Sequence, residues 1–482
     1  MPISHHLLRW SWAACGCLLF ACSPVSVIRN HQAQPMPAQY RGTSADSLSA
    51  LPEWRAFFSD PDLVALIDSA LAASPDQQIA LQRMQAARAA VMAARAPLAP
   101  QADAVAGASL RKFGLYTMDG AGNISTEMID GKLVPVNLPD FLLGVQASWE
   151  IDLWGKLRNR RQAAASRYLA SLESRRLVQT QLVASISLAY YELLALDASL
   201  GILNNTVRLQ EQALETVQAQ KAAGKVNELA VNQFEAQLLQ FRGMRQETEL
   251  RIFQLENAVN YLAGRYPAPV SRSRADFIQA APATVSAGRP SDLLERRPDV
   301  RQAMQELSAA QGDLNAAKAD FYPSLNLSGM LGLQAFRPDL LATLPQSAAY
   351  GLLSGLTAPL ANRRMLKAGF AYADAAEQEA FYRFQQTLLQ AYLEVADHAA
   401  SIRNLDTLLD LKQQEVEVLS AAIRNSAELF RTGRATYLEV LIAQQNALQA
   451  QLEQADLKKQ RMQAAVHLYR ALGGGWTADP PN

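Results

Sequence analysis

The sequence has few of the residues on which catalytic and metal centres depend. Its 482 residues include 3 cysteines and 5 histidines, and the histidines are scattered rather than spaced as metal ligands. No glycine-rich phosphate loop follows a stretch with strand periodicity. The 45 basic and 45 acidic residues cancel, so no excess charge favours nucleic acid. We therefore expect no enzyme activity, no cofactor, no metal site and no nucleic-acid partner.

Proline is absent from residues 140–266 and 363–472, although the chain has 22 prolines. Because proline breaks helix interiors, both gaps indicate long helices. The second stretch carries apolar residues seven apart, the spacing of a coiled coil: Ile402, Leu409, Val416, Ile423 and Phe430. Gly433 interrupts this pattern, and glycine there favours a helix end and a reversal. The sequence predicts an outgoing helix, a tight turn and a shorter returning helix.

The same plan occurs twice. Gly224 corresponds to Gly433, with an outgoing helix predicted at 156–223 and its return at 227–262. Pro75-Asp76 and Pro298-Asp299 each open a shorter helix. We infer a tandem duplication. The predicted segments are a signal peptide at 1–21, an extended N-terminal strap at 22–60, a first repeat at 61–264, a linker at 265–291, a second repeat at 292–473 and a tail at 474–482.

Each repeat also contains a predicted β-hairpin, at 101–153 and 324–360, ahead of coiled-coil hairpins at 154–264 and 361–473. Apolar residues alternate from Phe141 to Leu153, which indicates a strand with one apolar and one polar face. The other expected strands are 104–112, from Leu325 to Leu333, and 349–360. Strands of about ten residues are long enough to cross an outer membrane, although a soluble sandwich alternates in the same way.

Four strands are too few for a membrane barrel, because the smallest ones use eight. Open sheet edges are not tolerated in lipid. If these strands span a membrane, the chain must therefore be an oligomer, and two or three copies would supply eight or twelve strands.

The N-terminus has the pattern of an export signal. Arg9 precedes an apolar run that is too short to remain as a transmembrane helix. The run ends in Leu19-Phe20-Ala21-Cys22, which resembles the lipobox of bacterial lipoproteins, in which the cysteine is lipidated after cleavage. The pattern predicts lipidation at Cys22. The alternative is an ordinary signal peptide with an incidental cysteine.

Several further motifs occur in order along the mature chain. They are Trp149-Glu-Ile-Asp152-Leu-Trp-Gly155-Lys, Ala319-Asp-Phe-Tyr-Pro323, Phe430-Arg-Thr-Gly433, Leu438-Glu439-Val-Leu441 and Ala471-Leu-Gly473-Gly474. With the lipobox and the paired Pro-Asp helix starts, they give the chain a resemblance to the TolC-like outer-membrane factors. The resemblance is to the lipoprotein branch with NodT- and OprM-type channels.

This resemblance implies a mainly α fold with a membrane β-barrel. Three chains would form a homotrimer with a twelve-stranded barrel in the outer membrane and a twelve-helix coiled-coil tunnel in the periplasm. It also implies the function of an efflux channel that passively conducts small molecules. Its partners would be a periplasmic adaptor (membrane fusion) protein, an inner-membrane efflux transporter of the RND type or a related one, and outer-membrane lipid.

The two turns are the candidate contacts with the adaptor. They carry Gly224, Lys225 and Val226 in the first repeat and Gly433, Arg434 and Ala435 in the second, beside Lys221 and Arg431. The alternative is that these residues are only solvated ends of hairpins.

Glu439 and Ile442 are the candidate gate residues. Three copies of Glu439 would form a ring of carboxylates that repel one another and attract cations. Ile442 occupies a position that is often acidic in the family, so the gate would be partly hydrophobic and would close by dewetting. The alternative for Glu439 is an ordinary exposed coiled-coil residue.

Two isolated polar residues are interpreted as structural. Asp152 is expected to cap a helix or lie at an aqueous rim rather than act as a general base. His398 is expected to pack against the coiled coil. Two other protein classes remain as hypotheses: a structural coiled-coil lipoprotein without channel activity, which needs no duplicated strand pairs, and a periplasmic adaptor, which has a single helical hairpin.

Overall fold

The computed structural model describes residues 35–41, 51–128, 131–273, 277–278, 286–359 and 363–476. The predicted signal peptide at 1–21, Cys22 and the end of the predicted tail, 477–482, lie outside the described residues. The described chain forms two compact units. Unit 1 contains Ala86–Tyr168 and Gln305–Phe381, and unit 2 contains the described parts of Gln32–Gln85, Leu169–Met304 and Tyr382–Asn482. Each unit draws on both predicted repeats, whose boundaries stay a prediction.

The elements of unit 1 are mainly strands. They are η1 (Ala96–Leu98), β1 (Gln101–Lys112), α5 (Met118–Asn123), β2 (Asn137–Ile151), β3 (Ser324–Ala335), η3 (Pro338–Leu340) and β4 (Ala348–Thr357). Four helices contribute to both units: α4 (Pro75–Arg95), α6 (Lys156–Ala222), α9 (Pro298–Ala319) and α10 (Arg363–Arg431). Unit 2 adds α2 (Trp54–Phe57), α3 (Pro61–Ala73), α7 (Glu228–Leu262), η2 (Pro290–Asp292), α8 (Leu293–Arg296) and α11 (Tyr437–Ala471).

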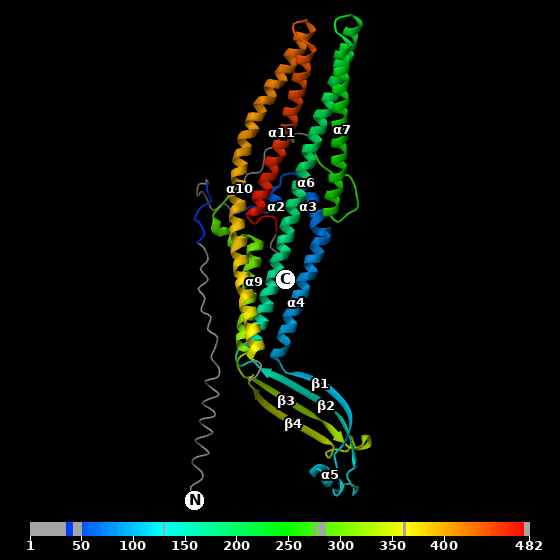
Figure 1. Cartoon of the computed structure of the whole chain (residues 1–482), viewed down its shortest axis with the longest axis vertical. Coiled ribbons are helices and arrows are strands. Elements are labelled where there is room, and N and C mark those ends of the chain that lie inside the picture. Colours follow the sequence, from blue (N-terminus) through cyan, green and yellow to red (C-terminus); the bar gives the residue numbers. More distant parts are fainter. Residues whose placement is uncertain are drawn as a thin grey trace. The chain divides into compact units, whose positions relative to one another are not determined.

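The four strands of unit 1 form one antiparallel sheet in the order β1-β2-β3-β4, visible as a curved layer in Figure 1. The predicted pair of β-hairpins is therefore confirmed, with shifted ends. β2 begins at Asn137 rather than at Phe141, because residues 137–140 continue the hydrogen-bonded ladder with β1 beyond the apolar alternation. β2 ends at Ile151, and Leu153 lies in the turn into α6, where its N–H donates to the Ile151 carbonyl. β4 ends at Thr357, three residues before the expected 360.

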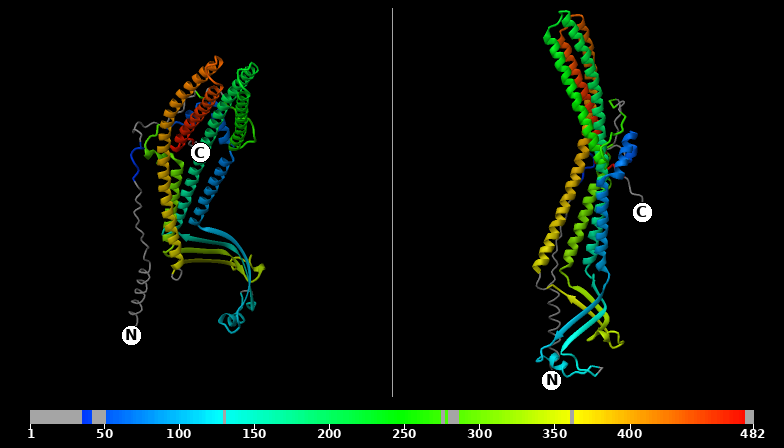
Figure 2. Two further views of the ribbon diagram at one scale, coloured as in Figure 1. Left: turned by 45° about the horizontal axis from the view of Figure 1, so that its top comes forward. Right: turned by 90° about the vertical axis from the view of Figure 1, so that its right-hand side faces the viewer.

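Unit 2 is built on two long antiparallel helix pairs, α6 with α7 and α10 with α11, as the sequence predicts (Figures 1 and 2). Its largest core contains the apolar side of α6, including Ile186, Tyr190 and Leu193, all of which are fully buried. Phe57 is buried there too, and its ring stacks on Tyr469 with centroids 4.1 Å apart. An aromatic side chain thus docks this end of the predicted strap, and residues 54–57 are helical rather than extended, as α2.

One stretch of α6 is apolar enough to cross a membrane, the only such helix in the described part of the chain. A core helix passes the same test, and the buried residues of α6 lie in the core of unit 2. The apolar character of α6 is explained by this packing.

The two hairpin turns have the same backbone geometry. Gly224 and Gly433 take φ values of +72° and +71°, in the left-handed region that favours glycine. The N–H of Lys225 donates to the Gln220 carbonyl at 2.9 Å, and the N–H of Arg434 donates to the Leu429 carbonyl at 2.8 Å. These bonds satisfy carbonyls at the helix ends and reverse the chain within a few residues.

Candidate functional site

One face of the sheet is apolar from edge to edge. The register aligns Ala104, Val145, Leu331 and Tyr350 in one row across the four strands. A neighbouring row is Ala102, Ala147, Gly329 and Leu352. The larger side chains of this face are exposed, with 68% of Leu331, 85% of Tyr350 and 78% of Leu352 accessible. A broad exposed apolar surface of this kind requires a partner that is not water.

The opposite face carries polar and small residues. One row consists of Asp103, Gln146, Met330 and Gly351, and its neighbour consists of Gln101, Ser148, Ser328 and Leu353, so this face is mainly but not wholly polar. Alternation between an apolar and a polar face is the arrangement of a membrane barrel wall, with lipid on one side and water on the other.

The sheet has two open edges. In the described residues, β1 and β4 each pair with a single neighbouring strand, β2 and β3 respectively. Their outer backbone N–H and C=O groups have no water to bond with in a bilayer. A sheet placed in lipid must therefore pair both edges with further strands.

A pair of glycines lets β2 and β3 approach closely. Gly144 and Gly332 lie opposite each other in the register. A Cβ atom on Gly144 would lie 2.6 Å from the Leu331 carbonyl oxygen, and one on Gly332 would lie 2.5 Å from the Leu143 oxygen. Only glycine fits this place, where it favours a sharp bend of the sheet.

The junction of β2 with α6 is fixed by Asp152. Its carboxylate accepts hydrogen bonds from the N–H groups of Leu157 and Arg158, at 3.0 and 2.9 Å. Partial burial acts to raise the pKa of Asp152, but the hydrogen bonds from Arg158 and Leu157 outweigh it and lower the pKa. Asp152 thus caps the start of α6, and the predicted capping role is confirmed.

Aromatic residues lie at the same junction. The Trp154 ring stacks on Tyr322 with centroids 4.9 Å apart, and the indole N–H donates to the Pro323 carbonyl at 2.8 Å. Half of the Trp154 surface, 51%, is exposed. Aromatic side chains with one polar atom are typical of the boundary between lipid and water.

The structure brings the two turns of unit 2 together through one apolar cluster. Val217, Ala230, Val231, Phe234 and Leu441 are buried in it, with Val226, Phe430 and Tyr437 packed against them. Of the predicted contact residues, Gly224, Lys225, Gly433 and Arg434 are exposed, whereas Val226 and Ala435 are half-buried. The exposed part of this tip is therefore narrower than predicted.

Glu439 is exposed, and it also caps the start of α11, a role that the sequence analysis did not assign to it. Its carboxylate accepts the Thr436 backbone N–H and lies 3.2 Å from the Thr436 hydroxyl, which completes a capping box at the start of α11. The pattern Thr436-x-x-Glu439 is a sequence signal for this arrangement. Ile442 lies three residues further along, with 49% of its surface exposed.

Sequence reasoning missed a contact between two histidines. The rings of His398 on α10 and His467 on α11 stack with centroids 5.0 Å apart and an interplanar angle of 11°. Burial and the neighbouring His398 lower the pKa of His467 to about 4, and burial also lowers the pKa of His398. The pair is therefore neutral near pH 7.

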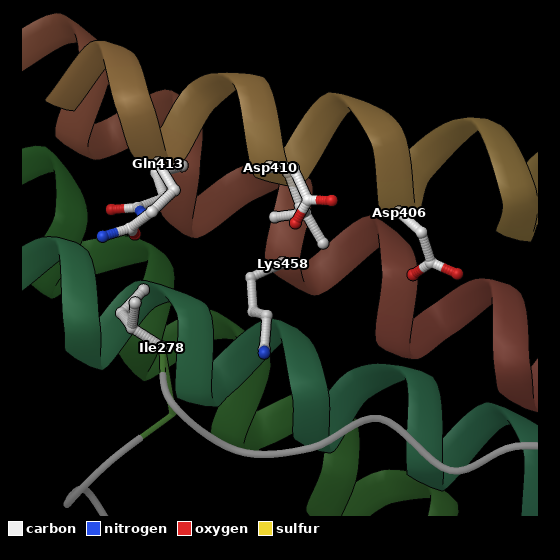
Figure 3. Close-up of a pocket in the computed structure, with 7 residues that line it drawn as sticks. Ile278, Asp406, Asp410, Gln413 and Lys458 are labelled. Atoms are coloured by element: carbon white, nitrogen blue, oxygen red, sulfur yellow. The ribbon is translucent and has the colours of Figure 1, made fainter.

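A polar cavity of about 400 Å³ lies beside α10 and α11 (Figure 3). Asp406, Asp410 and Gln413 come from α10, Lys458 comes from α11, and Ile278 lines the cavity from the connecting segment. Burial and the nearby Arg461 lower the pKa of Lys458. The cavity is lined by both acidic and basic side chains, and the described residues contain no cluster of three metal-ligating side chains.

The geometry of the sheet and the paired hairpins agrees with comparisons to known proteins. The family model described as Outer membrane efflux protein matches residues 66–264 and 289–474. The chain belongs to this family. The chain is 32% identical over 451 residues to the pyoverdine export outer membrane protein OpmQ of Pseudomonas putida, covering 92% of this chain and 93% of OpmQ. It is 28% identical over 460 residues to SilC, a probable outer membrane lipoprotein of Salmonella typhimurium, covering 94% and 96%.

A solved structure of CusC has the same fold. It aligns with this outer membrane efflux protein at a TM-score of 0.81 and 26% identity, covering 94% of this chain and 100% of CusC. The predicted resemblance and the predicted fold class are therefore confirmed. Relatives of this family are outer membrane proteins, which agrees with the predicted localisation.

Proposed function

We propose that this outer membrane efflux protein forms the outer-membrane channel of a tripartite efflux system and passively conducts small molecules to the exterior. The observation that carries the proposal is the four-stranded sheet, with one apolar face, one polar face and two open edges. In this proposal the helical hairpins form the periplasmic part of the channel. The protein acts by providing a water-filled path, and we infer no catalytic role for it.

The channel is a homotrimer in this proposal. Three copies pair the free edge of β1 with the free edge of β4 of a neighbour and give a closed twelve-stranded barrel. Native mass spectrometry of the purified full-length protein in detergent tests this. The expected particle has three times the mass of the mature chain, and a stable single-chain particle would contradict closure by oligomerisation.

The exposed part of the tip is the proposed contact with a periplasmic adaptor, which in turn binds an inner-membrane efflux transporter. Lys225 and Arg434 are exposed, one in each of the two turns that pack on the shared apolar cluster. A photo-crosslinking residue at Lys225 or Arg434 should capture the adaptor in cells. The same residue at Arg88, which is exposed on α4 in unit 1, should not. Equal capture at all three positions would mean that the tip has no specific contact.

Glu439 and Ile442 are the proposed gate. Glu439→Gln keeps a side chain that can complete the capping box but removes the charge, whereas Glu439→Ala removes both. If the carboxylate ring acts on ions, both variants lose cation selectivity in single-channel recordings. Selectivity that is unchanged in Glu439→Gln would leave Glu439 as a helix cap only.

Lipidation at Cys22 is the proposed anchor, because the lipobox resemblance agrees with the description of SilC as a probable lipoprotein. Metabolic labelling with radioactive palmitate should mark the wild-type protein and not Cys22→Ala.

The names of relatives cover pyoverdine, cations and toluene. Because these compounds differ so much, we infer that the inner-membrane transporter determines the exported compound.

A further inference from the structure

One side of the sheet is formed by the strand ends that adjoin the helices, and it is called the helix-proximal edge here. It carries a concentration of positive charge that the channel function does not explain. β1 and β3 start at this edge, and β2 and β4 end there, because neighbouring strands are antiparallel. The sequence segments at this edge, 95–100, 150–161, 318–323 and 358–367, contain nine Lys or Arg and three Asp or Glu. The local formal charge is therefore +6, in a chain whose basic and acidic residues cancel.

Part of this charge is neutralised within the protein. Lys156 lies 2.9 Å from Glu150 and 3.4 Å from Asp320, and Arg160 also contacts Asp320, at 3.3 Å. Arg158 pairs with Asp152 at the start of α6. These contacts hold the junction together, so Lys156, Arg158 and Arg160 have little charge left for an external ligand.

Of the other six basic residues at this edge, Arg363 makes a contact within the protein, and five have no acidic partner within the described part of the chain. They are called the collar here: Arg95, Arg161, Lys318, Arg364 and Lys367. Four of them are exposed, and Lys318 is half-buried. Each of the four strand ends has at least one collar residue within ten positions along the sequence. The unpaired charge therefore follows the whole edge rather than one helix.

The collar lies next to the boundary that the aromatic residues mark. Trp154 and Tyr322 are at the same strand ends, and the apolar face of the sheet begins beside them with Ile151 and Leu325. Aromatic residues of this kind lie at headgroup depth. Basic side chains one or two helical turns from that boundary meet the phosphates of lipid headgroups, and each contributes about 1 kcal/mol when the lipid is anionic.

We propose that the collar binds anionic phospholipid headgroups in the inner leaflet of the outer membrane. The proposal rests on the membrane placement of the sheet in the proposed function, and it adds a lipid preference to it. A continuous apolar surface, an aromatic boundary and a ring of unpaired cations together fit a negatively charged phospholipid better than a zwitterionic one. The bound lipid would fix the depth of the channel in the membrane.

Native mass spectrometry with titrated lipids tests the proposal on the full-length oligomer. The wild-type protein should retain phosphatidylglycerol in preference to phosphatidylethanolamine. The triple variant Arg161→Gln, Arg364→Gln, Lys367→Gln should lose this preference, by roughly fivefold for each charge removed. The charge-preserving variant Arg161→Lys, Arg364→Lys, Lys367→Arg should keep it.

A matched control removes three exposed charges away from the junction: Arg83→Gln, Arg88→Gln, Arg424→Gln. This control should bind phosphatidylglycerol as the wild type does. Equal retention of both lipids by the wild type, or an unchanged preference in the neutral collar variant, would overturn the proposal. A preference for lipid A over phosphatidylglycerol would overturn the assignment to the inner leaflet. Bilayer conductance separates the lipid-binding proposal from the channel proposal. If the wild type conducts but shows no lipid preference, only the lipid-binding proposal is contradicted.

Discussion

At the residue scale, one glycine at each turn sets the direction of a 35-residue returning helix, α7 or α11. The positive φ of Gly224 and Gly433 is a conformation that a side chain makes costly. Nothing lies within 4 Å of a Cβ atom built on either glycine. The requirement for glycine at these positions is therefore a property of the backbone and not of packing.

Replacing Gly433 tests whether the requirement for glycine comes from the backbone conformation rather than from packing. We expect Gly433→Ala to destabilise the hairpin by about 1 kcal/mol, because alanine resists the left-handed conformation, and Gly433→Asn to cost less. The midpoint of thermal unfolding in detergent measures the difference. Equal midpoints for the wild type and Gly433→Ala would contradict a backbone origin.

At the scale of elements, some contacts could be predicted from the sequence and others could not. His398 and His467 are 35 and 34 residues from Gly433, so an antiparallel hairpin brings them together. Lys412 and Glu453 follow the same rule and form an ion pair at 2.8 Å. β1 was predicted too short, because alanine and glycine give little alternation over Gln101–Lys112. The register between β2 and β3 pairs residues that are 174 to 194 positions apart in the sequence, which no local pattern specifies.

The histidine pair should make the α10–α11 hairpin sensitive to acid. The folded pKa of His467, about 4, lies below its ordinary value of 6.5. The stabilisation is therefore complete above about pH 6.5 and is lost as the pH falls toward 4. Because the ring is half-buried, solvent screening limits the loss to about 1–2 kcal/mol per chain.

Thermal unfolding of the wild type and His467→Gln between pH 7 and pH 4 measures this effect. The difference in stability between the two proteins should shrink as the pH falls, because acidic groups elsewhere titrate equally in both. Parallel pH profiles would show that the pair does not contribute.

The close approach of β2 and β3 gives a second test at this scale. Gly144→Ala should lower the yield of folded oligomer in the membrane, because its Cβ atom would meet the backbone of β3. Gly329→Ala in the inner strand β3 is the control, since a Cβ atom there would meet no atom closer than 3.5 Å. Heat-resistant oligomer on gels is the measurement, and an equal yield from both variants would contradict the packing argument.

At the scale of the whole molecule, closure into a barrel explains both the polar face of the sheet and its open edges. A sheet with one face for lipid and one for water is complete only when further strands close it into a barrel. The sequence predicted this need for partners on the condition that the strands span a membrane, because four strands are too few for a barrel and lipid does not tolerate open edges. It did not predict the two compact units, because they combine segments from both repeats.

Single-channel recording in planar lipid bilayers tests the central claim most directly. Purified full-length protein should produce discrete, long-lived conductance steps, because the closed barrel encloses a continuous water-filled path. Membrane-inserted, folded protein that never conducts would contradict the account.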